Sequence, residues 1–360
     1  MKKKTPNLLF LFPLIICFLI SCSTNTKSTQ DVRTFDKFPI TLHLSHEEIQ
    51  TEANLYCIGG LLLLDSILVS VDLKADTFFH VFKLPLFDYQ GSFIKRGPGP
   101  EEEIFIYPFI GRVSESEFLY NGVSSIKIAK YNHQTNKLEI VEQINLPPDL
   151  FEIWNSIKLG DSIISNKATG VMDEKYINKE FIGYNLQNKE IFDFGAEYPF
   201  VGEYIESHLK DVIFGKTNVL KPDGSAFATV YDKFPILRIY TNTGEIKKEV
   251  RLENGQSFPY ALIEEDPSTY SFNEIMQNYR MIRSSNNFIY ALYIGKREQE
   301  LDEGLNDFSN EIHVWNWEGE PIQRILLDEK IFTFDVDLHD NYLICSSLLS
   351  LNALYKYNLK

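Results

Sequence analysis

One short unit recurs along the chain, and its clearest copy is EIHVWNWEGEPIQRILL at residues 311–327. Side chains alternate between the two faces of a strand, so Ile312 and Val314 point to one face and the residues between them to the other. The segment then turns at a stretch that ends in Gly319, a residue that can take a positive φ. Pro321–Leu327 returns as a second strand. The unit predicts one hairpin of an antiparallel sheet.

A polar turn followed by an apolar strand occurs six times. These segments are Asp65–Val69, Glu115–Tyr120, Gly160–Ile164, Pro222–Phe227, Asn286–Tyr290 and Asp340–Ile344. After each comes a strand with a marker aromatic, and these aromatics are Phe87, Tyr131, Tyr184, Tyr240, Trp315 and Tyr357. The aromatics span 270 residues in five steps, a mean of 54. Periods of this size are typical of propeller blades with about four short strands each.

Burial explains the repetition. One four-stranded sheet would expose both of its faces, whereas stacking sheets around an axis covers each face with the next. Aromatic residues make up 14% of the chain and suit such contacts between sheets. We therefore predict an all-β fold over residues 37–360, a six-bladed β-propeller of four-stranded antiparallel blades. An early strand such as Phe38–Leu44 is expected to pair into the final blade and close the ring.

One stretch departs from the β pattern. Ser271 and Glu274 have the spacing of a capping box, and Phe272, Ile275, Met276 and Tyr279 fall at helical spacing. We predict one short helical insertion at about Phe272–Arg283. A shorter helix is expected within Tyr198–Asp211.

The N-terminus resembles a bacterial lipoprotein signal. Lys2–Lys4 form a basic region, and Leu8–Ile20 is an apolar run too short to span a bilayer. The following Ser21-Cys22 resembles the end of a lipobox, which implies that residues 1–21 are removed and that Cys22 carries lipid. The alternative is an ordinary secretory signal with a cysteine there by chance. Residues 22–36 are polar and are expected to form a flexible tether.

By the same resemblance, Ser23 after the cysteine implies the outer membrane, with the periplasmic face favoured over the cell surface. The formal charge is −15, and loss of the three signal lysines leaves 32 Lys and Arg against 50 Asp and Glu, or −18. This acidity argues against nucleic acid and against adhesion to anionic lipid, so membrane contact is expected through the lipid alone. We expect a monomer with one folded domain.

Two cysteines remain in the mature chain, Cys57 and Cys345. An exported protein meets oxidising conditions, in which a disulfide is permitted. Two interpretations stay open: buried free thiols, or a bridge between the two ends of the folded domain.

Standard catalytic motifs are not found in the sequence, which has no nucleophile elbow, zinc helix, Walker loop or Cys-x-x-Cys pair. Gly97–Glu103 predicts a rigid turn between blades with solvated acids, or else a cation site. The acidic segment Glu298–Asp307 has the same two interpretations. His43 and His46 are predicted to face opposite ways, which argues against a zinc pair.

With these features in hand, the chain resembles the TolB-like six-bladed propeller lipoproteins of Gram-negative bacteria. The residues that carry the resemblance are Asp65–Val69, Phe87–Gly91, Gly97–Glu102, Tyr290–Tyr293 and Glu311–Leu327. The run from Gly97 is similar to a Gly-x-Gly-Pro-Gly-Glu turn of that group, with Glu101 in place of the third glycine. The resemblance implies the fold and transfers no catalytic residues, since propellers serve binding, signalling and catalysis alike.

Two functions follow as hypotheses. The first is a binding or scaffold module for an envelope protein, peptide or glycan. The second is a calcium-dependent hydrolase or lyase, similar to lactonases, with its site in the central channel. Calcium is the one cofactor considered, and its candidate ligands are Asp65, Asn121, Asn166, Asp223 and Asp337. The same residues are also what any propeller needs at the entrances of its strands.

Overall fold

The fold is described from a computed structural model of the chain, in which residues 31–360 form one compact unit. The structure describes residues 32–150, 153–167, 176, 179–202, 205, 209–253, 275–300, 308–347, 350 and 353–360. The predicted signal peptide, Cys22 and most of the predicted tether lie outside these residues. Within the described ranges, no helix is long and apolar enough to cross a membrane.

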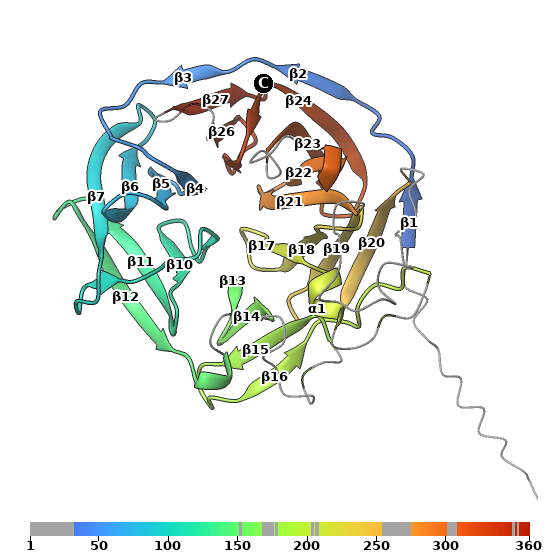
Figure 1. Ribbon diagram of the computed structural model, residues 1–360, viewed down its shortest axis with the longest axis horizontal. Helices are drawn as coiled ribbons and strands as arrows, with labels where there is room; N and C mark the ends of the chain where they lie inside the picture. The colour runs from blue at the N-terminus through green and yellow to red at the C-terminus, as the bar shows by residue number, and fades with distance from the viewer. Residues whose placement is uncertain are drawn as a thin grey trace, which may run out of the picture. The chain divides into compact units, whose positions relative to one another are not determined.

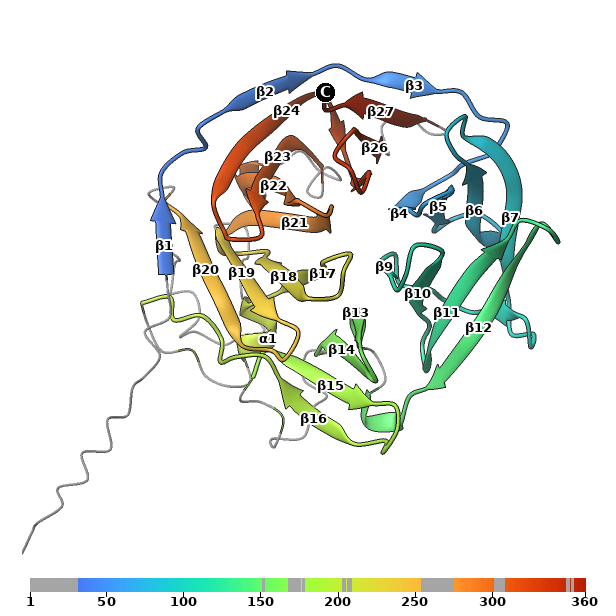
Figure 2. The ribbon, with the colours of Figure 1, turned by 180° about the vertical axis from the view of Figure 1, so that it is seen from behind.

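Six small sheets surround a common axis, each with one strand near the axis and the next strands progressively farther out (Figures 1 and 2). Blade 1 contains β4 (Ile58–Leu63), β5 (Ile67–Asp72), β6 (Thr77–Lys83), β7 (Asp88–Arg96) and β8 (Glu102–Glu103). Blade 2 contains β9 (Ile110–Arg112), β10 (Glu117–Asn121), β11 (Ser125–Asn132) and β12 (Lys137–Asn145). Blade 3 contains β13 (Trp154–Leu159), β14 (Ser162–Asn166), β15 (Phe181–Asn185) and β16 (Ile191–Phe194).

The remaining three blades each take one strand from the N-terminal segment. Blade 4 contains β17 (Lys216–Leu220), β18 (Ala226–Tyr231), β19 (Ile236–Thr241), β20 (Ile246–Leu252) and β1 (Val32–Phe35). Blade 5 contains β21 (Met276–Ser284), β22 (Phe288–Arg297), β23 (Ser309–Asn316), β24 (Pro321–Ile331) and β2 (Thr41–Leu44). Blade 6 contains β25 (Thr333–Val336), β26 (Tyr342–Ser346), β27 (Leu354–Asn358) and β3 (Glu47–Ile49).

The predicted all-β, six-bladed propeller is confirmed, and the recurring turns lead into the second strand of every blade. The hairpin at residues 311–327 is β23 paired antiparallel with β24, and Gly319 in its turn has a φ of +77°. Blades 1, 4 and 5 have five strands where four were predicted. In each of these three the extra strand is short and lies parallel to its neighbour.

The N-terminal segment runs around the outside of three successive blades (Figures 1 and 2). β1 adds to β20, β2 adds to β24, and β3 pairs antiparallel with β27. An early strand therefore completes the final blade as predicted, but it is β3 and not Phe38–Leu44. The prediction of a tether through residue 36 is also wrong at its end, because β1 satisfies the free backbone groups at the edge of blade 4.

The predicted helix at Phe272–Arg283 is wrong over the described part, where Met276–Ser284 is the inner strand β21. Residues 272–274 lie outside the described residues. An inner strand packs against a neighbouring blade on each face, so Tyr279, Met281 and Ile282 are all buried. Apolar residues on both faces do not show the alternation that distinguishes a strand from a helix. Residues 203, 204 and 206–208 of the second predicted helix lie outside the described residues, and the helix described at its end is the single turn α1 (Lys210–Ile213). The described 3-10 turns are η1 (Pro148–Leu150) and η6 (Glu298–Glu300).

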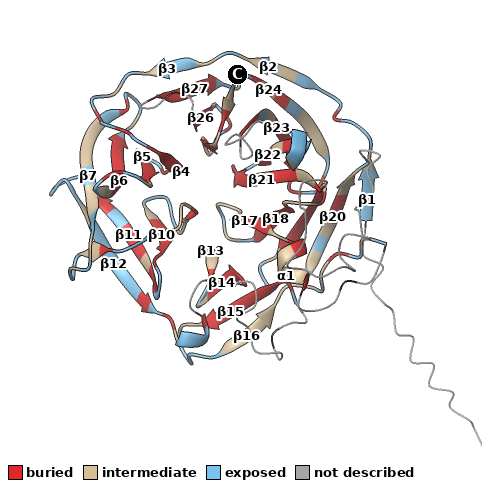
Figure 3. Ribbon diagram, viewed as in Figure 1, coloured by how far each residue is buried: buried red, intermediate tan, exposed pale blue. Residues whose placement is uncertain are grey.

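The core lies between blades. A buried apolar cluster joins every adjacent pair, including blade 6 to blade 1, where Ile344 and Leu354 pack with Leu61, Leu63 and Leu68. Burial is greatest on the inner and middle strands, and exposure increases toward the outer strands and the N-terminal segment (Figure 3). Packing between neighbours therefore holds the ring together and fixes which side chains reach the axis.

Candidate functional site

The inner strands β4, β9, β13, β17, β21 and β25 surround a small cavity at the centre of the ring. The cavity volume is about 30 Å³, and every inner strand contributes to its wall. The wall residues are Leu62, Ile110, Gly111, Arg112, Asn155, Ser156, Ile157, Asn218, Val219, Leu220, Arg283, Ser284 and Asp335. About half of these are apolar, and the charged ones are two arginines and one aspartate.

The three charged residues come from three blades and are linked through the backbone of Leu63. Arg112 donates from Nη2 to the Leu63 carbonyl at 2.5 Å, and the Leu63 N–H donates to Asp335 at 2.6 Å. Arg283 Nε lies 3.7 Å from the Asp335 carboxylate and donates to the Phe334 carbonyl at 3.0 Å. These contacts hold both guanidinium groups in place.

Two guanidinium nitrogens at this site have no hydrogen-bond partner among the described residues: Nη1 of Arg112 and Nη2 of Arg283. Both atoms are buried, and Arg283 as a whole is 5% exposed. A buried charged donor without a partner costs free energy, and such groups in native proteins call for an explanation.

The cavity carries excess positive charge. Burial lowers the pKa of Arg112 and of Arg283; Asp335 opposes that effect at both, and Asp337 and Glu115 also oppose it at Arg112. Arginine nevertheless stays protonated in proteins because its ordinary pKa is so high. Burial raises the pKa of Asp335, and Arg283 and Arg112 offset part of the rise. With Asp335 ionised the three side chains sum to one positive charge, and protonation of Asp335 increases the excess.

The polar side chains that blades 3 and 4 contribute to the wall, together with Ser284 of blade 5, are neutral. Asn155 has a φ of +51° within a register irregularity between β13 and β14, a conformation that asparagine tolerates better than most residues. Its amide exchanges hydrogen bonds with the backbone of Asn218, one of them from Asn155 Nδ2 to the Asn218 carbonyl at 3.4 Å. Ser284 donates to the Leu220 carbonyl at 2.8 Å. These bonds tie blades 3, 4 and 5 together at the axis.

The five predicted calcium ligands do not meet, and none of them is part of the cavity wall. Asn121 and Asn166 are buried between blades, where Asn121 donates to Ser156 Oγ at 2.7 Å and Asn166 donates to the Lys216 carbonyl at 2.7 Å. Asp65, Asp223 and Asp337 lie in turns. Asp223 accepts from the Ser225 N–H at 2.9 Å, and Asp337 accepts from the Asn341 amide at 2.6 Å. All three turn residues precede the second strand of a blade.

The structure also shows where the two cysteines and the described parts of the two acidic segments lie. Cys57 and Cys345 are both buried and both free, so the structure contains no bridge between them. Glu103 forms an ion pair with Lys127 at 2.6 Å and is 9% exposed, so the prediction of solvated acids is wrong at Glu103, whereas Glu101 is exposed. Residues 301–307 of the second acidic segment lie outside the described residues. The described parts of the chain hold no group of three His, Cys, Asp or Glu side chains arranged to bind a metal ion.

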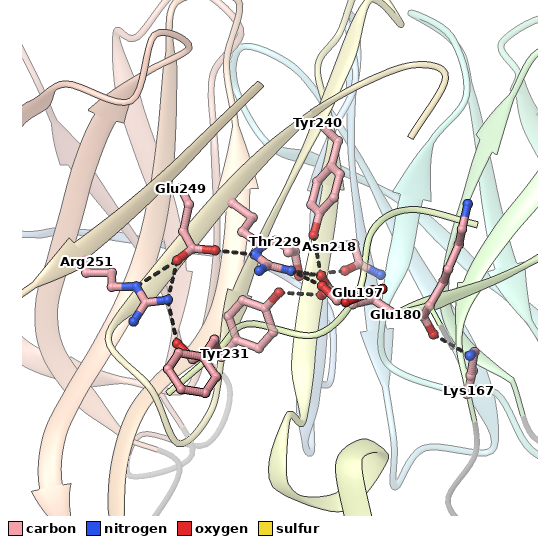
Figure 4. Close-up of polar contacts among 12 residues, drawn as sticks. Lys167, Glu180, Glu197, Asn218, Thr229, Tyr231, Tyr240, Glu249 and Arg251 are labelled. Carbon is pink, nitrogen blue, oxygen red and sulfur yellow. Dashed lines mark hydrogen bonds and ion pairs between the residues drawn. The ribbon is translucent and has the colours of Figure 1, made fainter. Parts of the chain in front are cut away.

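A second buried charge cluster lies between blades 3 and 4 (Figure 4). Arg238 bridges Glu180 and Glu249, with an Nε–Oε2 distance of 2.7 Å to Glu249. Tyr231 and Tyr240 also donate to Glu180, the latter at 2.7 Å. Each charged group in this cluster has its partners, so we assign it a structural role.

The sequence interpretation missed Arg112, Arg283 and Asp335. Each is a charge beside apolar residues in the strand that precedes one of the six recurring turns, as in Ile110-Gly111-Arg112, Met281-Ile282-Arg283 and Phe334-Asp335-Val336. A charge in a strand buried on both faces is the signal that could have identified them.

Comparison with known proteins agrees with this architecture. The model of the family described as TolB-like 6-blade propeller-like matches residues 61–339. A crystal structure of a duf4221 family member from Bacteroides vulgatus has a TM-score of 0.57 at 13% identity, covering 88% of this chain and 98% of its own. A crystal structure of a Bacteroides fragilis protein assigned as exported has a TM-score of 0.59 at 12% identity. The match covers 92% of this chain and 99% of the Bacteroides fragilis chain. At these identities the two structures establish similarity of fold alone. No curated protein matches the chain.

Proposed function

The chain belongs to the TolB-like six-bladed propeller family, and from this premise we propose that it is a binding module of the bacterial envelope that holds a protein, peptide or glycan. The observation that carries the proposal is the cavity at the axis, whose wall contains two arginines and one carboxylate. A concave site with a few convergent polar groups is the usual form of a binding site. The wall offers positive charge and hydrogen-bond donors for holding a ligand.

The proposed location is the periplasmic face of the outer membrane, with Cys22 as the lipid anchor. The basic n-region, the apolar run and the lipobox-like end at Ser21-Cys22 support export and lipidation. The similarity to an exported Bacteroides fragilis protein supports the envelope. In this proposal the lipid is the sole membrane contact, because the mature chain is strongly acidic.

Lipidation is tested by expressing the full chain in a Gram-negative host with labelled palmitate. The wild-type chain is expected to take up label and to fractionate with the outer membrane. Cys22→Ser is expected to lose the label and to appear in the soluble periplasmic fraction. Equal labelling of both chains would contradict the assignment of Cys22.

The alternative, a calcium-dependent hydrolase or lyase, requires several oxygen ligands around one cation. Among the described residues the cavity wall carries one carboxylate, and that one lies beside Arg283. A cation there would be repelled by both guanidinium groups. This electrostatic argument places binding ahead of calcium-dependent catalysis.

The two functions are separated by thermal unfolding of the mature chain in EDTA and in millimolar calcium, together with assays on esters and lactones. A ligand at a hundredfold excess over its Kd stabilises the folded state by about 2.7 kcal/mol. We expect no calcium-dependent shift and no turnover. A shift of several degrees, with hydrolysis abolished by Asp335→Asn, would overturn the proposal.

A further inference from the structure

We propose that the central cavity binds a carboxylate group, held between the guanidinium groups of Arg112 and Arg283. The inference rests on the proposed binding function and names the chemistry that the channel recognises in its ligand.

The first argument is the pair of unpartnered donors. Arg112 uses Nη2 on Leu63, and Arg283 uses Nε and Nη1 on backbone carbonyls, the latter at 3.0 Å. Arg112 Nη1 and Arg283 Nη2 remain without a partner in the described part of the chain. Each guanidinium group is thus held by the protein, and in each one buried nitrogen keeps N–H donors without a partner in the described part of the chain. An arginine with an unpartnered donor is well suited to a carboxylate, whose oxygens accept charge-assisted hydrogen bonds.

The second argument is geometric. Arg112 belongs to blade 2 and Arg283 to blade 5, which are three steps apart in a ring of six. The two strands therefore lie on opposite sides of the axis, both residues are part of the cavity wall, and their guanidinium groups are held by the neighbouring blades 1 and 6. An anion on the axis can contact both, whereas one bound to an outer surface of the ring can contact neither.

The third argument is charge. Two arginines and Asp335 leave one positive charge in the wall, which one carboxylate neutralises. A phosphate dianion would reverse the sign of the site and is less well matched. The rest of the mature chain is strongly acidic, so its long-range field repels anions and the selectivity must come from these two side chains at close range.

Asp335 acts as a positioning residue. Its carboxylate receives the Leu63 N–H at 2.6 Å and lies 3.7 Å from Arg283 Nε, on the edge of the guanidinium that Nε shares with Nη2. It therefore fixes the orientation of Arg283.

Size and wall chemistry define the ligand further. A volume of about 30 Å³ admits about two water-sized groups, the size of the two oxygens of a carboxylate. Leu62, Ile110, Ile157, Val219 and Leu220 supply apolar surface beside the arginines. A carboxylate on a short aliphatic chain suits this combination better than a compact inorganic anion.

The experiment is a calorimetric titration of the mature chain, residues 22–360 with Cys22→Ser, using butyrate and acetate as probes at constant ionic strength. Chloride and phosphate are titrated in parallel. We expect saturable binding of butyrate, with weaker binding of chloride and phosphate. Arg112→Met and Arg283→Met should each raise the butyrate Kd about tenfold or more, because each removes a charge-assisted hydrogen bond.

Arg33→Met is the matched control. Arg33 lies on β1 at the outer edge of blade 4 and is 48% exposed, so its loss should leave butyrate binding unchanged. Because Arg283→Met strips Asp335 of its partner, Arg283→Met with Asp335→Asn is included to remove both charges together. Circular dichroism and thermal unfolding verify that each variant is folded before titration.

Three outcomes overturn the inference: a folded wild-type chain that binds neither carboxylate, equal affinity for chloride or phosphate, and folded arginine variants that bind butyrate as well as wild type does. These results are distinct from failure of the proposed function. Calcium-dependent turnover would overturn the binding function, whereas a channel that ignores butyrate would overturn the carboxylate site and leave binding elsewhere on the ring intact.

Discussion

Replacing Arg238 with methionine is expected to destabilise the contact between blades 3 and 4 severely. The Arg238 side chain is 2% exposed, and its partners Glu180 and Glu249 are 0% and 1% exposed. Arg238 also donates to the Glu197 carbonyl at 2.6 Å. In Arg238→Met the buried carboxylate of Glu180 loses its cation, and Glu249 keeps only Arg251 (Figure 4).

The expected loss in the free energy of unfolding depends on the partners that Glu180 and Glu249 keep in Arg238→Met. Breaking a buried ion pair by removing one partner costs about 3–5 kcal/mol. Glu180 keeps the hydroxyl of Tyr240 at 2.7 Å, and Glu249 keeps Arg251 Nε at 2.7 Å. We therefore expect a loss near the lower end of that range, about 3 kcal/mol in the free energy of unfolding.

The assay is urea unfolding followed by tryptophan fluorescence. A matched triple variant, Arg238→Met with Glu180→Gln and Glu249→Gln, removes the three buried charges together and should recover much of the loss, since the cation it leaves without its carboxylate, Arg251, is 29% exposed to solvent. If Arg238→Met loses less than about 1 kcal/mol, or if the triple variant is no more stable than the single, the reasoning from uncompensated charge is refuted.

Three further predictions address pH, the N-terminal segment and a turn. Burial tends to raise the pKa of Asp72, but the His80 side chain, whose Nε2 lies 3.6 Å away, and backbone hydrogen bonds from Tyr56, Lys74 and Ala75 outweigh it, and the pKa lies well below its ordinary value. Asp72 therefore stabilises the fold above about pH 4 and loses that contribution as the pH falls further. Asp72→Asn should cost about 2–3 kcal/mol at neutral pH in urea unfolding, and a gap to wild type that does not shrink in acid would contradict this. A chain that starts at residue 37 lacks β1 and its pairing with β20, so calorimetry should show a lower unfolding midpoint than for a chain that starts at residue 32; equal midpoints would mean that β1 contributes nothing. Gly319→Ala should cost about 1–2 kcal/mol in thermal unfolding, because φ is +77° and a Cβ would lie 2.9 Å from Val250. Gly224→Ala, with φ at +71° and open space around it, is the control, and an equal cost for both would show that the contact is unimportant.

Local patterns in the sequence predicted most of the ring. A strand that alternates beside a polar turn is encoded within about ten residues, and six copies at a regular spacing imply six sheets that cover one another. The hairpin at residues 311–327 and the six recurring turns are therefore predicted correctly. β21 was mistaken for a helix, because a strand buried on both faces loses the alternation that identifies it.

Long-range pairing was predicted less well. The sequence indicated that an early strand closes the ring, yet the choice of β3 over Phe38–Leu44 depends on which outer edges are free along the path of the N-terminal segment. Pairing through backbone hydrogen bonds leaves little trace in side-chain pattern, as β1 illustrates by lying where the composition predicted a tether.

The sequence by itself determined the repeat, the fold class, the acidic charge and a lipoprotein-like N-terminus. The tertiary structure alone decided the site, because Arg112, Arg283 and Asp335 come from blades 2, 5 and 6 and meet only when the ring closes. Aspartates and asparagines in turns looked like ligands because of their type, but the turns hold Asp65, Asp223 and Asp337 away from the cavity wall. The physical reason is that strand formation depends on neighbours in the chain, whereas the chemistry at the axis depends on neighbours in space.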